Sequence, residues 1–368
     1  MVRYVGNPRG VLSVHVSVKA LSGASVKMWI RECAAFFFIS RYTFARKRGV
    51  KMNGCNFSKV DVDDFQLWMR LMMQSEKART PCHLISYDGI QSGRKWLFRG
   101  QSDAEWYLSS SLERAVDYQS RLWEKGEIEK IEKGCVDEFQ RLANCILPDR
   151  NLNPFDWVAL LQHSGGPTRL IDFSYSACVA LYFATSEISY KDDDKKKSES
   201  DFAVWAISLD NQSYVNDRSG IDAECPCACE FGTYKNTAKE LFDDEGFGSE
   251  RSRIYLGFPK FGSPRSNAQS GVFLFQSDFE KSFMEYLTEC LGPQKPIKLS
   301  EVCSEDIFEN ECSTSLSKVI KFTFPHKFRQ EATLALRSMN IFPHTLFPDL
   351  DGVAQTVARS VSELSAHS

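Results

Sequence analysis

Apolar residues recur at helical spacing in some parts of this chain and at strand spacing in others, so the pattern predicts both kinds of element. Spacings of three and four predict helices over residues 61–73, 127–147, 154–163, 175–187, 279–290 and 328–339. Short apolar or alternating runs predict strands over residues 95–99, 202–208, 272–276 and 318–324. Because the elements follow no regular strand–helix rhythm, we expect an α+β class, a mixed sheet with flanking helices.

Local signals predict where some of these elements begin. Asn153 is expected as an N-cap, with Pro154 at the first helical position. Near the end of the chain, Asp349 or Asp351 is expected to cap a final helix, with Phe347 in the core. Residues 210–262 are acidic and are expected to be irregular.

The composition mainly argues against three classes of protein: disordered, nucleic-acid-binding and membrane-spanning. With 43% apolar and 25% charged residues, most of the chain is expected to fold rather than to be disordered. A net charge of -3 gives no strong signal for a nucleic-acid partner. No apolar run reaches the roughly 18–20 residues of a membrane span, so no membrane partner is expected.

The charge divides the chain into two parts. Residues 1–51 carry +9, so the remainder carries -12. We therefore predict a basic N-terminal extension over residues 1–51 and one domain over residues 52–368. The extension is open to three interpretations: a poorly ordered basic tail, a transit peptide, or a segment ahead of a native start at Met52.

Twelve scattered cysteines do not form a disulfide framework in a chain of this length, which favours reduced thiols and a cytoplasmic location. The cluster Cys225, Cys227 and Cys229 lacks the spacing of a zinc knuckle, so no metal site is expected. The motifs of P-loop proteins, zincins and nucleophile-elbow hydrolases do not occur.

Two segments concentrate candidate chemistry. In the first, a strand ends in Arg99, Gly100 and Gln101, and an arginine presented at a glycine turn suits phosphate or carboxylate. Its alternative is a buried structural arginine paired with Asp172. The second segment, residues 162–174, is dense in polar side chains. It is interpreted either as a satisfied polar network or as a pocket wall facing a polar ligand.

In the second segment, His163 titrates near neutrality when unperturbed, and Thr168 adds a hydroxyl. Arg169 and Asp172, three residues apart, are expected to fix each other. Ser174 and Ser176 precede an apolar helix.

Four ordered motifs resemble the FRG domain family. They are FRGQS at 98–102, QHSGGPTRLIDFSYS at 162–176, PRSNAQSGVF at 264–273 and LFPDLDG at 346–352. The resemblance extends over about residues 60–358, with small departures at Gly166 and Ala177. It implies a bacterial or phage-associated intracellular protein.

The order of these motifs also resembles, more loosely, the ADP-ribosyltransferase fold of the Arg-Ser-Glu type. That resemblance implies that Arg99 holds the diphosphate of NAD, that Ser174 or Ser176 positions the ribose, and that Gln269 stands where an acid belongs. It further implies a toxin or anti-phage effector with a protein acceptor.

A neutral amide at 269 supplies no charge for an oxocarbenium-like transition state. Either Asp172 supplies that charge, or the site binds a nucleotide or another anionic small molecule without turning it over. The alternative is a non-catalytic ligand-sensing or interaction domain with a structural Arg–His–Asp network.

Overall fold

We analysed a computed structural model of the 368-residue chain. It describes residues 3–6, 12–15, 57–77, 96–118, 122–124, 126–147, 152–186, 200–208, 231–233, 254–257, 259, 263–288, 296–301 and 319–366. The candidate zinc cluster at 225–229 lies outside these residues.

The chain divides into two units, one of residues 1–48 with 163–166 and one of residues 49–162 with 167–368. In the first unit, β1 (Arg3–Gly6) and β2 (Leu12–His15) pair as an antiparallel hairpin. The predicted boundary between residues 51 and 52 stays a prediction.

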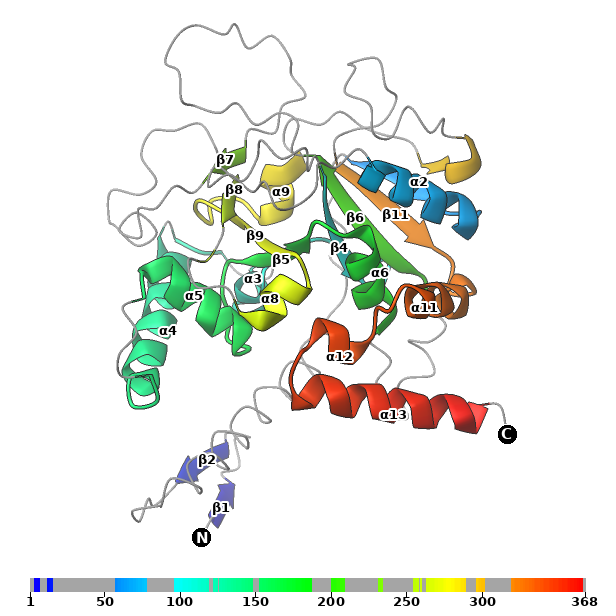
Figure 1. Cartoon of the computed structure of the whole chain (residues 1–368). Coiled ribbons are helices and arrows are strands. Elements are labelled where there is room, and N and C mark those ends of the chain that lie inside the picture. The colour runs from blue at the N-terminus through cyan, green and yellow to red at the C-terminus, as the bar shows by residue number, and fades with distance from the viewer. Residues whose placement is uncertain are drawn as a thin grey trace, which may run out of the picture. The chain divides into compact units, whose positions relative to one another are not determined.

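A nine-stranded mixed sheet organises the described part of the second unit, in the order β10-β3-β11-β6-β4-β5-β9-β8-β7 (Figure 1). Its strands are β3 (Ser58–Asp61), β4 (Trp96–Gln101), β5 (Ile171–Ser174), β6 (Phe202–Ser208), β7 (Phe231–Thr233), β8 (Ile254–Gly257), β9 (Gly271–Gln276), β10 (Ile297–Lys298) and β11 (Val319–Phe324). The parallel pairs are β10 with β3, β3 with β11, and β7 with β8, and the other pairs are antiparallel. The expected α+β class with a mixed sheet is therefore confirmed.

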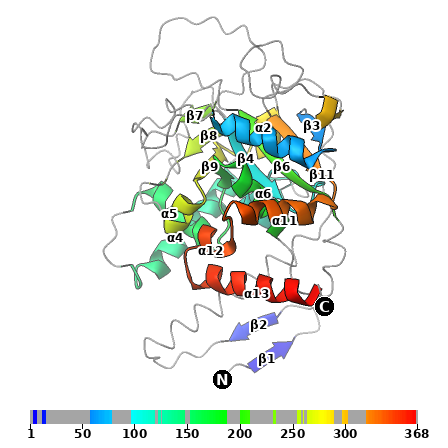
Figure 2. The same ribbon diagram turned by 45° about the vertical axis from the view of Figure 1, so that its right-hand side comes forward.

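Helices flank both faces of this sheet. They are α2 (Phe65–Lys77), α3 (Ser111–Ala115), α4 (Glu127–Ala143), α5 (Pro154–His163), α6 (Ala177–Ser186), α8 (Pro264–Ala268), α9 (Phe283–Thr288), the 3-10 turn η3 (Leu299–Glu301), α11 (Phe328–Ser338), α12 (Pro343–Leu346) and α13 (Leu350–Ala366). The core of one face joins α2, α6 and α11 to the strands, as Figures 1 and 2 show. On the other face, α9 packs against side chains that alternate with these along β4 and β6, and against side chains of β5 and β9.

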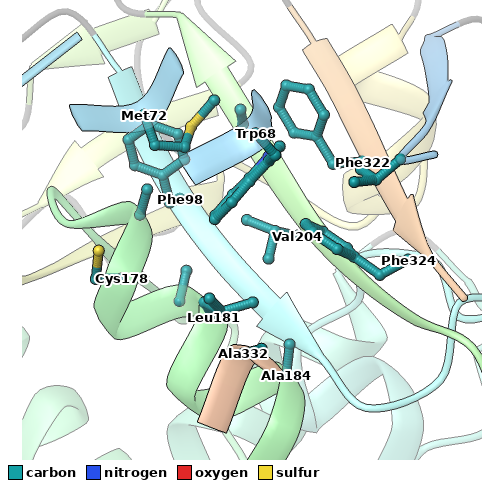
Figure 3. Packing of buried hydrophobic residues seen from close by; sticks show 14 of the residues in the cluster. Trp68, Met72, Phe98, Cys178, Leu181, Ala184, Val204, Phe322, Phe324 and Ala332 are labelled. Carbon is teal, nitrogen blue, oxygen red and sulfur yellow. The ribbon is translucent and has the colours of Figure 1, made fainter. Parts of the chain in front are cut away.

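Large apolar side chains fill the space between α2, α6 and the sheet (Figure 3). Trp68 and Met72 of α2 are almost completely buried, as are Phe98, Phe322 and Phe324 of the strands. Full burial of such a side chain contributes roughly 1.5–3 kcal/mol each. This packing holds β4, and with it the candidate arginine, in a fixed position.

Several predicted element ends are confirmed, and each has a capping residue. The Asn153 side chain accepts from the N–H of Asp156 at 2.8 Å, and Pro154 opens α5. Asp349 accepts from the N–H of Gly352 at 2.9 Å at the start of α13, and Phe347 packs against the core.

Other predictions were wrong in extent or type. The helix expected from residue 61 begins at Phe65, because Asp64 caps it and residues 58–61 are drawn into β3. Similarly, Ser282 caps α9, so that helix begins at Phe283 and not at residue 279. Residues 210–262 contain β7 and β8, and an apolar run at 254–257 carries the second of these strands.

Candidate functional site

The sheet brings the predicted catalytic residues onto neighbouring strands. Arg99 lies on β4, Asp172 and Ser174 lie on β5, and Gln269 is the C-cap of α8, two residues before β9. Since β4, β5 and β9 are consecutive in the sheet, all four residues lie in one region. These strands run antiparallel to one another.

The sheet is weakest where this region lies. β4 and β5 share one register pair, Phe98 with Ser174, whereas β4 and β6 share six. Beyond this pair the two strands diverge beside Arg99. Because Phe98 and Ser174 are paired, their side chains lie on the same face of the sheet. Arg99 follows Phe98, and Asp172 stands two residues before Ser174, so the side chains of Arg99 and Asp172 start on opposite faces.

Arg99 and Asp172 meet across this divergence. Arg99 Nη1 donates to the backbone oxygen of Asp172 at 2.6 Å and lies 3.8 Å from Asp172 Oδ2. The side chains are 23% and 60% exposed, respectively. The predicted alternative of an Arg99–Asp172 pair is therefore present, but the carboxylate is exposed rather than buried.

Gln162, on α5, holds the same carboxylate from another side. Its Nε2 donates to Asp172 Oδ2 at 2.9 Å, and its Oε1 accepts from Thr168 Oγ1 at 2.6 Å. The backbone N–H of Thr168 in turn donates to Ser111 Oγ at 3.0 Å. Thr168, predicted to bind a ligand, is fully buried and fixes Gln162 instead. Two side chains, Arg99 and Gln162, thus contact Asp172 independently.

Ser174 and Ser176 organise the start of α6. Ser174 Oγ donates to the backbone oxygen of Gln269 at 2.8 Å and accepts from the N–H of Ser176 at 2.9 Å. Ser176 Oγ accepts from the N–H of Val179 at 3.4 Å, as an N-cap does. Ser174 is buried, and both hydrogen-bonding roles of its hydroxyl are in use.

Gln269 joins this region to the closing motif. Its Nε2 donates to the backbone oxygen of Leu346 at 3.1 Å, and nearby Arg265 pairs with Asp349 at 3.0 Å. The Arg265 guanidinium also stacks on Phe347, 4.6 Å from the ring centre. The four motifs therefore form one connected set of contacts, in which Gln269 is an internal hydrogen-bond donor.

Arg169 does not pair with Asp172, so that expectation was wrong. It is completely buried, and its Nε donates to Glu132 Oε2 of α4 at 2.6 Å while its backbone N–H donates to Glu132 Oε1 at 2.8 Å. Nη1 also donates to the backbone oxygen of Ser277 at 2.8 Å. Arg169 and the two residues that follow it, Leu170 and Ile171, are all buried in the interior.

Of the remaining residues predicted to contact a ligand, Gln101 and Gly100 make contacts within the protein, and His163 lies at the surface. Gln101 accepts from Trp205 Nε1 at 2.7 Å and donates to the backbone oxygen of Tyr107 at 3.1 Å. Gly100 lies against the backbone of α6. His163 ends α5 with an exposed side chain, so it is not part of a buried Arg–His–Asp network.

Sequence reasoning missed two residues of this region, Gln162 as a holder of Asp172 and Glu132 as the partner of Arg169. Glu132 left a signal: it stands four residues after Ile128, on the apolar side of the predicted helix. A buried acid requires a partner, so a carboxylate at such a position predicts an ion pair. Gln162 left no signal beyond its place in the motif.

A buried lysine lies on the same face of the sheet as Arg99 and Gln101. Lys321 of β11 is 4% exposed, and its Nζ donates to the backbone oxygen of Trp106 at 2.8 Å. The Nζ lies 4.8 Å from the ring centre of Trp205 and 5.3 Å from that of Tyr107. Burial lowers the pKa of Lys321 to about 8.

The lowered pKa of Lys321 should make the stability of the protein depend on pH. Between about pH 8 and 10.5, the unfolded chain keeps the Lys321 proton while the folded chain has lost it. The free energy of unfolding therefore rises with pH in this window through Lys321. Urea denaturation should show the wild type gaining stability from pH 8 to 10.5 relative to Lys321→Met, with a constant difference below about pH 7. Parallel curves across the whole range would contradict a lowered pKa.

A cavity of about 140 Å³ lies apart from these residues, between α6, α11, α12 and α13. None of the predicted site residues lines it. Among the residues that the structure describes, no cluster of acids, cysteines or histidines suits a metal ion. In that same part of the chain, every helix is too short or too polar to cross a bilayer.

Comparison with known proteins identifies the motif-bearing region. Residues 94–193 match the family described as FRG domain, and the chain contains an FRG domain. The match extends from β4 through α6 and includes Arg99, Asp172 and Ser174, whereas the motifs at 264–273 and 346–352 lie outside it. No curated protein and no solved structure matches the chain.

Proposed function

We propose that the FRG domain of this chain is a non-catalytic ligand-sensing module, in which Arg99 binds the anionic group of a nucleotide such as NAD. The observation that carries this proposal is that the other polar side chains of the region are hydrogen-bonded within the protein. These side chains are Ser174, Gln269, Thr168 and Arg169. Arg99, in contrast, keeps a partly exposed guanidinium.

The contacts of Asp172 allow a phosphate to replace its carboxylate beside Arg99 with little loss of stability. A partly exposed ion pair contributes only about 0–1 kcal/mol, so loss of the contact between Arg99 and the Asp172 carboxylate changes stability little. The hydrogen bond from Arg99 Nη1 to the backbone oxygen of Asp172 is retained in this exchange, and the other guanidinium N–H groups bind the ligand. Asp172 keeps its bond from Gln162 after this exchange. A phosphate gains a charge-assisted, planar fork of donors from the arginine. Asp172 therefore acts as an internal competitor for the ligand.

The test measures NAD binding to the full chain by calorimetry, with two variants. Arg99→Ala should weaken binding by about tenfold or more, because a hydrogen bond to a charged group contributes roughly 1.5–3 kcal/mol. Asp172→Asn should tighten binding about two- to fivefold, because it removes the competing charge at a value of about 0.5–1 kcal/mol. Arg141→Ala, on the exposed face of α4, serves as the arginine control.

A second candidate, ADP-ribosyl transfer or NAD cleavage, is favoured by one observation. The order along the sequence is Arg99, Ser174, Gln269, and these residues lie on or beside the adjacent strands β4, β5 and β9. Of these strands, β4 and β5 share a single register pair. Here Asp172 would supply the charge that Gln269 lacks.

The same variants separate the two candidates. Under turnover, Asp172→Asn should reduce nicotinamide release by about 100–1,000-fold instead of tightening binding. Absence of NAD binding by the wild type, or binding that Arg99→Ala leaves intact, would contradict both.

A further inference from the structure

The cavity between α6, α11, α12 and α13 has a chemistry that the proposed function does not use. Ten residues line it: Tyr182, Thr185, Thr333, Leu336, Arg337, Ile341, Phe342, Pro343, Thr356 and Arg359. They come from α6, α11, α12 and α13 and from the short segment between α11 and α12. Its lining shares no residue with the Arg99 region, so this site is distinct from the proposed NAD site.

The lining carries positive charge. Two of the ten residues are arginines, three are threonines and none is acidic. Arg359 is held in place, because its Nη2 donates to the backbone oxygen of Ser186 at 3.0 Å and its guanidinium lies 5.0 Å from the ring centre of Tyr182. A fixed guanidinium loses little conformational freedom when it binds an anion. The lining therefore favours a negatively charged ligand.

Tyr182 also lines this cavity. Tyr182 is 3% exposed, and burial raises the pKa of its phenol above the usual value. At neutral pH the side chain is consequently uncharged and keeps its proton. It does not oppose the charge of an anion bound beside Arg359.

Size and apolar surface restrict the ligand further. Pockets for drug-sized ligands hold about 300–1,000 Å³, so 140 Å³ favours a ligand smaller than a nucleotide. A cavity of roughly 150 Å³ is large enough for one benzene ring. Leu336, Ile341 and Phe342 supply apolar wall beside the arginines. An apolar body of ring size with one anionic group satisfies both kinds of surface.

We infer that this cavity is a binding site for a small organic carboxylate, whose anionic group is held by Arg337 and Arg359 and whose apolar body packs on Leu336 and Phe342. Such a ligand joins α6 and α11 of the sheet-packed core to α13. Its binding free energy adds to the stability of that arrangement, because it binds the folded chain and not the unfolded one.

Calorimetry on the full chain tests this site with benzoate as the probe. Benzamide has nearly the same shape without the charge, and inorganic phosphate has charge without the apolar body. We expect saturable benzoate binding and at least about tenfold weaker binding of both benzamide and phosphate, since hydrogen bonds to charged groups contribute roughly 1.5–3 kcal/mol. This comparison needs no variant, so it does not depend on the folding of one.

Variants then locate the binding. Arg337→Gln and Arg359→Gln should each weaken benzoate binding by about tenfold or more. Arg141→Gln, an exposed arginine of α4, should leave it unchanged. Equal affinity for benzoate and benzamide, preference for phosphate, no saturable benzoate binding, or benzoate binding unaffected by Arg337→Gln would each overturn the inference. The Arg99→Ala variant should bind benzoate as the wild type does, which separates this site from the proposed NAD site.

Discussion

Replacing Glu132 with glutamine is expected to lower the free energy of unfolding by about 3–5 kcal/mol. Glutamine keeps the size and one oxygen, so the change removes the charge without creating a cavity. Arg169, completely buried, is then left with an uncompensated charge in the interior. Since a typical domain is stable by roughly 5–15 kcal/mol, this variant loses a large part of its stability. Urea denaturation measures the difference.

The same helix offers a matched control. Glu138 pairs with Arg141 at 2.5 Å, but both side chains are more than half exposed. Glu138→Gln is therefore expected to leave the midpoint of urea unfolding almost unchanged, as is usual for exposed helix pairs. Equal effects of the two substitutions would show that Glu132 has no special role, and that the buried pair does not anchor the candidate region.

Replacing Gly100 with alanine is expected to lower stability by about 1–3 kcal/mol or more, through overpacking. A Cβ at this position would lie 1.9 Å from the backbone oxygen of Ala180 and 2.6 Å from the backbone nitrogen of Ala184. Both atoms belong to the backbone of α6, so no side-chain rotation relieves the clash. Either α6 moves away from β4 or the strand shifts, and each change disturbs the start of α6 at Ser174 and Ser176. Thermal denaturation and near-UV circular dichroism measure these effects.

Gly134, in the middle of α4, gives the opposite expectation. A Cβ there meets nothing within 4 Å. Gly134→Ala should therefore stabilise the chain by about 0.4–1 kcal/mol, because alanine restricts the unfolded chain and favours the helix. If Gly100→Ala instead stabilised the protein as Gly134→Ala does, the close approach of α6 to β4 would be refuted. The glycine of the FRG motif would then need a role in ligand contact.

Much of the fold was predictable because its signals are local. The helical spacing over α4, the Asn153 cap of α5 and the apolar run of β11 each depend on residues that are close together in the sequence. Three residues of the predicted apolar stripe of α4, Ile131, Leu142 and Ile146, are nevertheless exposed. The α+β class followed from the order of such elements. The short strand β5 was not predicted, because residues 171–174 carry polar groups among the apolar ones and are paired along their whole length only with the distant strand β9, with one further pair to β4.

The candidate site shows the limit of the same reasoning. Residue types in order were enough to place Arg99, Asp172 and Ser174 in motifs of an FRG domain, whereas the motif that contains Gln269 lies outside the matched residues 94–193. The hydrogen-bond partners in this region depend on the fold: Arg169 binds Glu132, 37 residues earlier, and Ser174 binds the backbone of Gln269, 95 residues later. Hydrogen bonds of charged and polar side chains depend on which elements the packing of the core brings within about 3 Å. No periodicity along the chain encodes that distance.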